Sequence, residues 1–268
     1  MKKLLLCALT ILAFSCSSSD EAEILENQDT LDSYLLYYMN YPKETNPVDL
    51  TKLVTITKNN EGIITERIGG VYDANLDPAV GFKYFFSEKI YDELTYQDNT
   101  IIIEKKSMDS DLVIPTCKRT LIFDENQKII QKTIETSAPD KTDTIDFQYN
   151  VNGKISKILY KGPNIPKETS FYFNNNENLD SIVTIEYELE SDKTIKTLER
   201  FENYDSAENP IKELFIFEEL FYRSLSRNNY SLHWFEVFIT TPSSSSFSST
   251  YREWDLKYDA NGKVIFDE

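Results

Sequence analysis

The chain has 268 residues, of which 45 are acidic and 28 are basic, so its formal net charge is −17. This excess of acid argues against a nucleic-acid-binding protein, because such binding depends on Lys and Arg side chains that neutralise phosphates. It also argues against attachment to anionic lipid headgroups through the protein surface. The single histidine, His233, excludes a zinc site built from several His ligands and a two-His haem site within one chain.

The first fifteen residues predict an export signal. Lys2 and Lys3 precede an apolar run from Leu4 to Phe14. This run is shorter than the roughly 20 apolar residues that a transmembrane helix needs, and it has the length of the apolar part of a signal peptide. We therefore assign residues 1–15 to a signal peptide.

A cysteine stands at the switch from apolar to acidic residues in the stretch ILAFSCSSSDEAE. The tetrapeptide AFSC resembles the lipobox of bacterial lipoproteins, which implies that Cys16 is lipidated and becomes the mature N-terminus. The following serines with Asp20, Glu21 and Glu23 resemble the export tether of lipoproteins in Bacteroidota. Together these resemblances imply a lipid-anchored protein of the outer membrane that faces the cell exterior. The alternative is a buried N-terminal element with an incidental cysteine.

The segment from Cys16 to Pro42 has six acidic residues and no Lys or Arg. Such a stretch repels itself and stays solvated, so we expect an acidic tether over residues 16–42. Within this tether, the stretch EILENQDTLDSYLLYYMNYP favours a short helix that ends at Pro42.

The remaining residues, 43–268, predict a single antiparallel β domain. One unit of an apolar-x-aromatic strand followed by an Asn- or Gly-containing turn recurs at 121–129, 147–155 and 256–264, with a weaker copy at 171–179. Asn and Gly tolerate the positive φ that tight hairpin turns require, so each copy predicts a strand, a turn and a second strand. A looser hairpin is predicted over residues 53–68. We expect a long, twisted antiparallel β-meander of repeated hairpins with one wetted face.

The apolar positions change phase after one of these turns. Ile155 and Ile158 are three residues apart, where strict alternation would place apolar residues two apart. Either a β-bulge follows the turn or the strand is buried on both faces.

One segment departs from the strand pattern. NPIKELFIFEELFYRSLSRNN, residues 209–229, has apolar residues at helical spacing and predicts a helix over about residues 210–225, before the C-terminal hairpin. Asn209 is placed to cap it, and Pro210 suits its first turn.

Two further motifs carry a resemblance. YDANGKV, residues 258–264, resembles the strand-turn unit of YD-repeat proteins. FENYDSAENPIKEL followed by SLSRNNY is similar to an arrangement in uncharacterised, repeat-containing lipoproteins of Bacteroidota. The resemblance implies a curved antiparallel sheet with a helix inserted before the last hairpin, and it implies no activity.

Candidate functional residues are few. His233 lies beside two aromatic residues and is interpreted as a strand residue, and the acidic stretches lack the spaced ligands of a calcium loop. No catalytic residue, metal ligand or cofactor is therefore assigned. The surplus of aromatic residues (17 Tyr and 16 Phe) nominates Trp234, Phe247 and Trp254 as ligand contacts that could stack on a sugar or a peptide. The alternative is that these aromatic residues pack within the sheet.

We expect a non-enzymatic binding or interaction module of the cell envelope, held by its lipid, with a glycan or a protein as partner and no nucleic acid. The alternative is a carboxylate-dependent polysaccharide hydrolase, because a glycosidase needs only two carboxyl groups.

Overall fold

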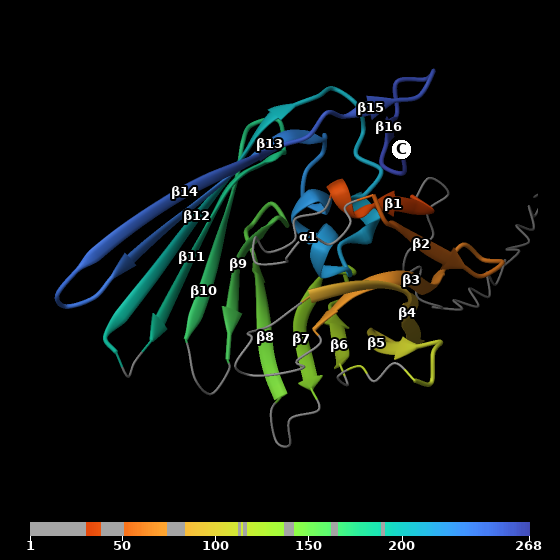
Figure 1. Cartoon of the computed structure of the whole chain (residues 1–268), viewed down its shortest axis with the longest axis horizontal. Helices are drawn as coiled ribbons and strands as arrows, with labels where there is room; N and C mark the ends of the chain where they lie inside the picture. The colour runs from red at the N-terminus through yellow and green to blue at the C-terminus, as the bar shows by residue number, and fades with distance from the viewer. Residues whose placement is uncertain are drawn as a thin grey trace, which may run out of the picture.

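The computed structural model describes residues 31–38, 51–73, 84–111, 114, 117–136, 142–161, 166–188 and 191–268. Within this part of the chain, fourteen strands form one antiparallel sheet, and each strand pairs with the next along the sequence (Figure 1). The two end strands do not pair with each other. The predicted antiparallel meander is confirmed.

The strands of the first half of the sheet are β1 (Ser33–Leu35), β2 (Leu53–Lys58), β3 (Ile64–Asp73), β4 (Tyr84–Gln97), β5 (Thr100–Ser107), β6 (Cys117–Phe123) and β7 (Ile129–Thr136). Those of the second half are β8 (Thr142–Tyr149), β9 (Ile155–Tyr160), β10 (Lys167–Phe173), β11 (Leu179–Glu188), β12 (Lys193–Tyr204), β13 (Tyr230–Thr240) and β14 (Ser245–Glu253). A small second sheet pairs β15 (Lys257–Tyr258) with β16 (Val264–Ile265). The helical elements are two 3₁₀ turns, η1 (Leu36–Tyr38) and η2 (Lys212–Leu214), and the helix α1 (Glu218–Ser224).

The predicted hairpins share one turn geometry. In each, the side-chain Oδ1 of an Asn or Asp accepts hydrogen bonds from the backbone N–H groups two and four residues later. These turn residues are Asn59, Asp124, Asn150, Asn174 and Asp259. The residue three positions after each of them has a positive φ, as the turn requires. The hairpins predicted from the repeat, and the looser one over residues 53–68, are therefore confirmed.

A β-bulge follows the turn in the four copies that belong to the main sheet. The register between β8 and β9 shifts at Tyr149, so that Ser156 is an extra residue on β9. Ile155 and Ile158 are consequently both buried on the same face. Of the two readings of their spacing, the bulge is the one observed.

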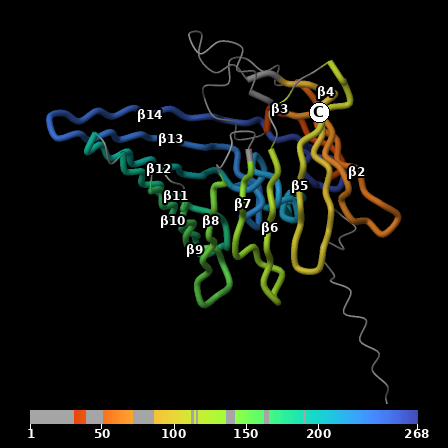
Figure 2. Tube along the Cα trace, turned by 90° about the horizontal axis from the view of Figure 1, so that it is seen from below, coloured from red at the N-terminus to blue at the C-terminus, as the bar shows by residue number. Residues whose placement is uncertain are grey.

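The sheet is curved, and the segment 209–229 lies against its concave face (Figures 1 and 2). Phe221 of α1 makes edge-to-face contacts with Phe147 of β8 and Phe171 of β10, with ring centroids 6.1 and 6.3 Å apart. The core of the molecule is therefore formed between the concave face and this segment.

The predicted helix over residues 210–225 is shorter than expected. Phe217 has an extended backbone (φ −96°, ψ 126°) and separates η2 from the seven-residue α1. The buried residues Ile211, Leu214, Ile216, Phe217 and Leu220 would cover more than half of the circumference of a continuous helix. The break allows all five side chains to reach the core.

Asn209 closes this segment at both ends. Its Oδ1 accepts a hydrogen bond from the N–H of Ile211 at 3.0 Å, but the N-cap of α1 is Phe217, so the prediction that Asn209 caps the helix is wrong. Its Nδ2 also donates to the carbonyl groups of Arg223 (2.7 Å) and Ser226 (2.9 Å), at the end of α1. One buried amide thus holds together the two ends of the insertion.

The helix expected in the acidic tether is wrong for its described part, residues 31–38. Strand β1 pairs with β2, η1 follows it, and Tyr34, Leu36 and Tyr38 are almost completely buried. The backbone N–H of Leu35 also donates to the carbonyl of Phe266 near the C-terminus, at 2.6 Å. Because these side chains are buried and β1 pairs with β2, residues 33–38 belong to the folded domain.

Candidate functional site

A cavity of about 360 Å³ lies between the concave face of strands β6–β9 and the segment 209–229. This volume falls in the range of roughly 300–1,000 Å³ that is typical of small-molecule sites. From the sheet it is lined by Leu121, Ile129, Lys132, Ile134, Ile145, Phe147, Ile158 and Tyr160. From the insertion it is lined by Phe215, Ile216, Glu218, Phe221 and Tyr222. The lining is mainly apolar, with one pair of opposite charges.

The bulge after each turn decides which side chains reach this cavity. In β7 the extra residue is Ile130, so Ile129 and Lys132 both face inward. In β9 the bulge at Ser156 likewise makes Ile155 and Ile158 face inward. Strict alternation from Ile129 would have placed Lys132 on the outer face. Lys132 was therefore not predicted as a site residue, although its place eight residues after the turn-forming Asp124, like that of Ile158 after Asn150, identifies it as inward-facing.

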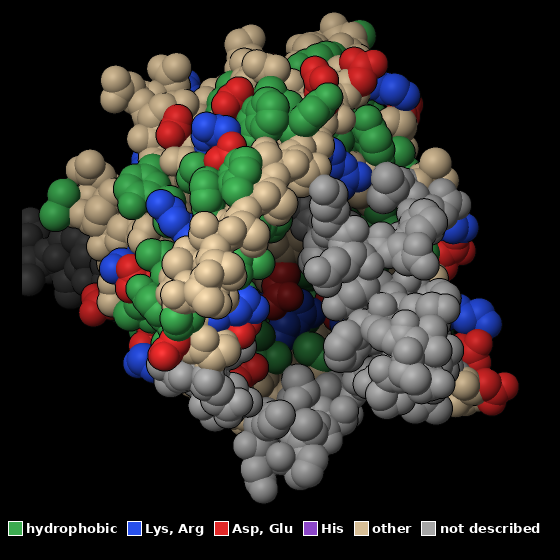
Figure 3. Space-filling model, turned by 60° about the vertical axis from the view of Figure 1, so that its left-hand side comes forward, with side chains coloured by type: hydrophobic (Ala, Val, Ile, Leu, Met, Phe, Trp, Pro, Cys, Tyr) green, Lys and Arg blue, Asp and Glu red, His purple; other side chains and the backbone are tan. Residues whose placement is uncertain are grey.

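The charged pair of the cavity is Lys132 and Glu218, which form an ion pair. The side chain of Lys132 is 13% exposed, whereas that of Glu218, the first residue of α1, is 55% exposed. The ammonium of Lys132, helped by Arg119, lowers the pKa of Glu218 to about 2. Figure 3 shows a hollow in the surface with acidic, basic and hydrophobic side chains at its floor.

A cluster of buried charges adjoins the cavity. Asp92 of β4 is 1% exposed, and its Oδ2 forms ion pairs with the guanidinium groups of Arg67 (β3) and Arg119 (β6), each at 2.7 Å, with Arg119 donating a hydrogen bond. Arg67 also pairs with Glu219 of α1, which accepts a hydrogen bond from the hydroxyl of Tyr34 at 3.0 Å. The cluster therefore joins three strands, the first turn of α1 and β1.

The position of the cluster follows from the strand pattern. Arg119 is two residues from Leu121 on the same face of β6, and Leu121 lines the cavity. Burial by itself would raise the pKa of Asp92, but the two guanidinium groups overcome this effect and hold it well below its usual range. Burial lowers the pKa of Lys105, whose Nζ donates to the carbonyl of Val71 at 3.2 Å.

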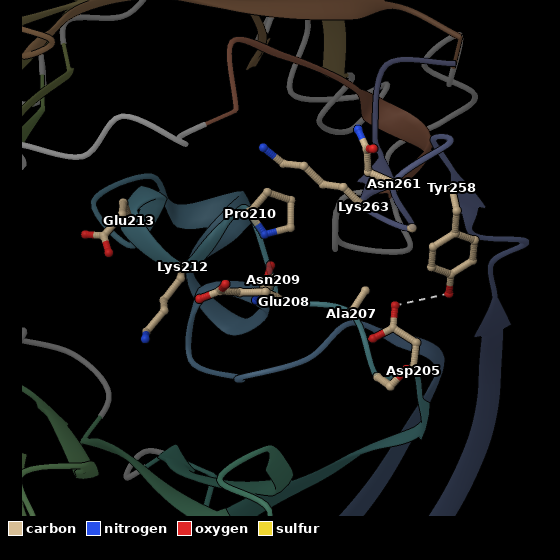
Figure 4. A pocket seen from close by; sticks show the side chains of 12 residues that line it. Asp205, Ala207, Glu208, Asn209, Pro210, Lys212, Glu213, Tyr258, Asn261 and Lys263 are labelled. Carbon is tan, nitrogen blue, oxygen red and sulfur yellow. Dashed lines mark hydrogen bonds between the residues drawn. The ribbon is translucent and has the colours of Figure 1, made fainter.

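A second pocket, of about 850 Å³, lies between the loop 205–213 and the turn that joins β15 to β16 (Figure 4). Asp205 accepts hydrogen bonds from the hydroxyl of Tyr258 (3.1 Å) and from the backbone N–H and side chain of Asn229. The polar side chains of the FENYDSAENP and SLSRNN stretches thus bind one another. Their arrangement explains these motifs as structural ties of the insertion, and we assign no ligand to this pocket.

The three aromatic residues predicted as ligand contacts are separated. Trp254 is 2% exposed and donates its indole N–H to the carbonyl of Tyr37 at 2.6 Å, so its prediction as a contact is wrong: it is a core residue. Trp234 lies on the opposite face of β13 from the buried His233 and packs on Tyr251 of β14, with ring centroids 5.0 Å apart.

Phe247 lies on the same outer face of the β13–β14 hairpin, 4.7 Å from the ring of Phe238, and is 58% exposed. A contact role for Trp234 and Phe247 stays a prediction, and neither lines the cavity. The lipidation residue Cys16 and the tether residues Asp20, Glu21 and Glu23 lie outside the described residues.

His233 is a strand residue of β13, as predicted, and its ring stacks on Phe201 with centroids 4.8 Å apart. Its Nε2 lies 2.8 Å from Oε2 of Glu199. Within the described ranges, no three His, Cys, Asp or Glu side chains gather in the manner of a metal site. In the same part of the chain, no helix has the length and apolar character needed to cross a bilayer.

No protein-family profile matches the chain, and no curated protein matches it. Among solved structures it is similar to a porin-like protein from Bacteroides uniformis, with 12% identity, a TM-score of 0.41, and coverage of 75% of this chain and 88% of that chain. It is also similar to a porin-like protein from Bacteroides vulgatus, with 11% identity, a TM-score of 0.43, and coverage of 83% and 98%. Neither likeness is close enough to assign a family or a function.

Proposed function

We propose that the protein is a binding protein of the cell envelope that holds a small apolar ligand in the cavity between β6–β9 and the segment 209–229. In this proposal a lipid on Cys16 anchors the chain to the outer membrane, and the acidic tether presents it at the cell exterior. The cavity is the observation that carries the proposal. Protein interiors are close-packed, so an apolar space of about 360 Å³ is a feature of the fold that a ligand can fill.

The chemistry of the lining favours an apolar ligand over a sugar. A sugar needs many hydrogen-bond partners, because each buried polar group without one costs free energy. The lining side chains that carry polar atoms are Lys132, Glu218, Tyr160 and Tyr222, and the first two are paired with each other. The remaining surface suits hydrocarbon or aromatic groups.

The carboxylates near the cavity support binding rather than hydrolysis. A glycosidase requires one carboxyl group with a raised pKa to act as general acid. The pKa values of Asp92 and Glu218 are both lowered, and both carboxylates are held by cationic side chains. These two groups are therefore poor proton donors near neutral pH.

Filling the cavity is expected to weaken the binding of an apolar probe. Wild-type protein should bind the neutral fluorescent probe N-phenyl-1-naphthylamine saturably, and Ile145→Trp should weaken that binding at least tenfold, because Ile145 lines the cavity. Leu159→Trp is the matched control, since Leu159 lies on the next strand and pairs with the outward-facing Asp146. Ile145→Phe serves as a milder filling if the Trp variant fails a thermal unfolding check. Absence of saturable binding to wild type, or equal binding by the two Trp variants, would reject the proposal.

The envelope location makes a separate prediction. Whole cells of the native host should be labelled at this protein by a membrane-impermeant reagent, and Cys16→Ala should release the protein from the membrane fraction. Neutralising Asp20, Glu21 and Glu23 should leave it anchored but unlabelled, because the acidic tether is then absent. If wild type is never labelled on whole cells, exposure at the cell exterior is wrong and the protein faces the periplasm.

A further inference from the structure

The Lys132–Glu218 ion pair of the cavity has one largely buried member and one exposed member. Among the described residues, Glu218 is the hydrogen-bond partner of Lys132. Lys132 extends from the middle of β7 and is largely buried, whereas Glu218 lies at the start of α1 with more than half of its side chain exposed. A rotation of the Glu218 side chain into solvent would leave the ammonium at the cavity wall without moving the backbone.

If the Glu218 side chain turned into solvent, the charged groups that remain beside the cavity would be mainly cationic. Lys132 and Arg119 are the cations that act most strongly on it, and Lys105 is next. Asp92 forms ion pairs with both Arg67 and Arg119, and Glu219 forms an ion pair with Arg67. With the Glu218 carboxylate turned away, four cations face two carboxylates. The site would then carry a surplus of positive charge, in a chain whose net charge is −17.

A buried cation is stable only with a partner, so a ligand that enters this site must bring a negative charge or leave the Lys132–Glu218 pair closed. The apolar lining continues from Lys132 through Ile134 and Ile145 to Phe147 and Phe221. An apolar body and an anionic end are thus accommodated side by side.

We propose that the ligand is an amphiphile with one apolar chain and one anionic head, a carboxylate or a phosphate, whose head replaces Glu218 as the partner of Lys132 while its chain fills the cavity. This proposal rests on the proposed function, because it specifies the ligand of the same cavity. The protein thereby selects against neutral molecules of the same length, since a neutral head cannot compensate Lys132 once Glu218 is displaced.

The test compares dodecanoate, dodecyl phosphate and dodecanol by displacement of N-phenyl-1-naphthylamine from the full folded domain. Wild type should bind at least one of the two anions tenfold or more tightly than the alcohol, and the stronger of the two identifies the head. Lys132→Met should remove this preference while still binding dodecanol. Glu218→Gln should bind the anions severalfold more tightly than wild type, because the competing carboxylate is gone.

Lys157→Met is the matched control, since Lys157 pairs with Glu168 at 2.6 Å on the outer face of the sheet and should leave all three affinities unchanged. If dodecanol binds wild type as tightly as both anions, the anionic head is wrong while the apolar cavity site stands. If none of the three displaces the probe, and the probe itself does not bind, the proposed function fails as well. Glu218→Gln keeps the test decisive if Lys132→Met does not fold.

Discussion

Replacing Asp92 with Asn is expected to lower the free energy of unfolding by about 3–5 kcal/mol, measured by urea denaturation at pH 7. Asp92 is 1% exposed and forms ion pairs with both Arg67 and Arg119. An amide in its place removes the negative charge and leaves the buried Arg119 without the carboxylate that forms an ion pair with it. The large cost arises from the uncompensated charge rather than from the lost bonds alone.

The double variant Asp92→Leu/Arg119→Met separates these two causes. It removes both charges together, and Arg67 keeps Glu219 as its partner, so it should be less destabilised than Asp92→Asn. Glu168→Gln is a control on the outer face, where a half-exposed ion pair with Lys157 contributes at most about 1 kcal/mol. This account would be contradicted if the unfolding free energy of Asp92→Asn were within about 1 kcal/mol of wild type. It would also be contradicted if the double variant were less stable than Asp92→Asn.

The same carboxylate predicts the direction of the acid dependence. The guanidinium groups hold the pKa of Asp92 well below its usual range in the folded protein. Its stabilisation is therefore complete above the unfolded-state pKa of about 4, and it is lost as the pH falls below that value, because the unfolded chain then binds a proton that the folded chain does not. Asp92→Asn should lack this part of the acid-induced loss.

Replacing Arg223 with Met is expected to cost about 3–5 kcal/mol of unfolding free energy, again measured with urea. Arg223 of α1 is 2% exposed and donates to the carbonyl groups of Tyr38 (2.6 Å) and Tyr230 (3.0 Å). Its guanidinium also lies over the rings of Tyr230 and Trp254, 4.1 and 4.4 Å from their centroids. Met retains some of the packing, but it leaves both buried carbonyl groups without these donors.

Arg227→Met is the matched control, because Arg227 is exposed four residues further along the same segment. It should change the unfolding free energy by no more than about 0.5 kcal/mol. Equal stability of the two variants would show that the docking of η1 and β13 on α1 does not depend on Arg223.

The parts of the fold that were predicted from the sequence are those that local chemistry decides. The turn at Asn150 is specified by its own side chain, by Gly153 and by the alternation on either side, all within a few residues. The same holds for the turns at Asn59 and Asp124. Local turn geometry repeated along the chain is sufficient to predict a meander of hairpins.

The candidate site could not be predicted in this way, because its residues come from several strands and from the insertion, and they meet through strand pairing, as Arg67 and Asp92 do, or through packing of the insertion on the sheet. Arg67, Asp92 and Arg119 lie on three different strands, and as single residues they resemble ordinary surface charges. Lys132 reaches the cavity only because of a bulge. A bulge reverses the face of every residue that follows it, so a strand pattern read from simple alternation assigns Lys132 to solvent.

Tertiary packing also overrode the local helical signals. The segment 209–229 has helical spacing, but its buried residues from Ile211 to Leu220 would cover more than half of the circumference of a continuous helix, and the segment is broken into η2 and α1 at Phe217. In the N-terminal segment, Tyr34 and Leu36 enter the sheet and the core although acidic residues precede them. In both places long-range contacts decided the structure.

The central claim, that an apolar ligand occupies the cavity between β6–β9 and α1, is tested most directly by locating a heavy atom. Crystals grown with 12-bromododecan-1-ol would be measured at the bromine absorption edge, at a concentration that displaces the fluorescent probe in solution. The account predicts an anomalous peak among Phe147, Ile158 and Phe221. A peak on the outer face of the β13–β14 hairpin, or an empty cavity under these conditions, would contradict it.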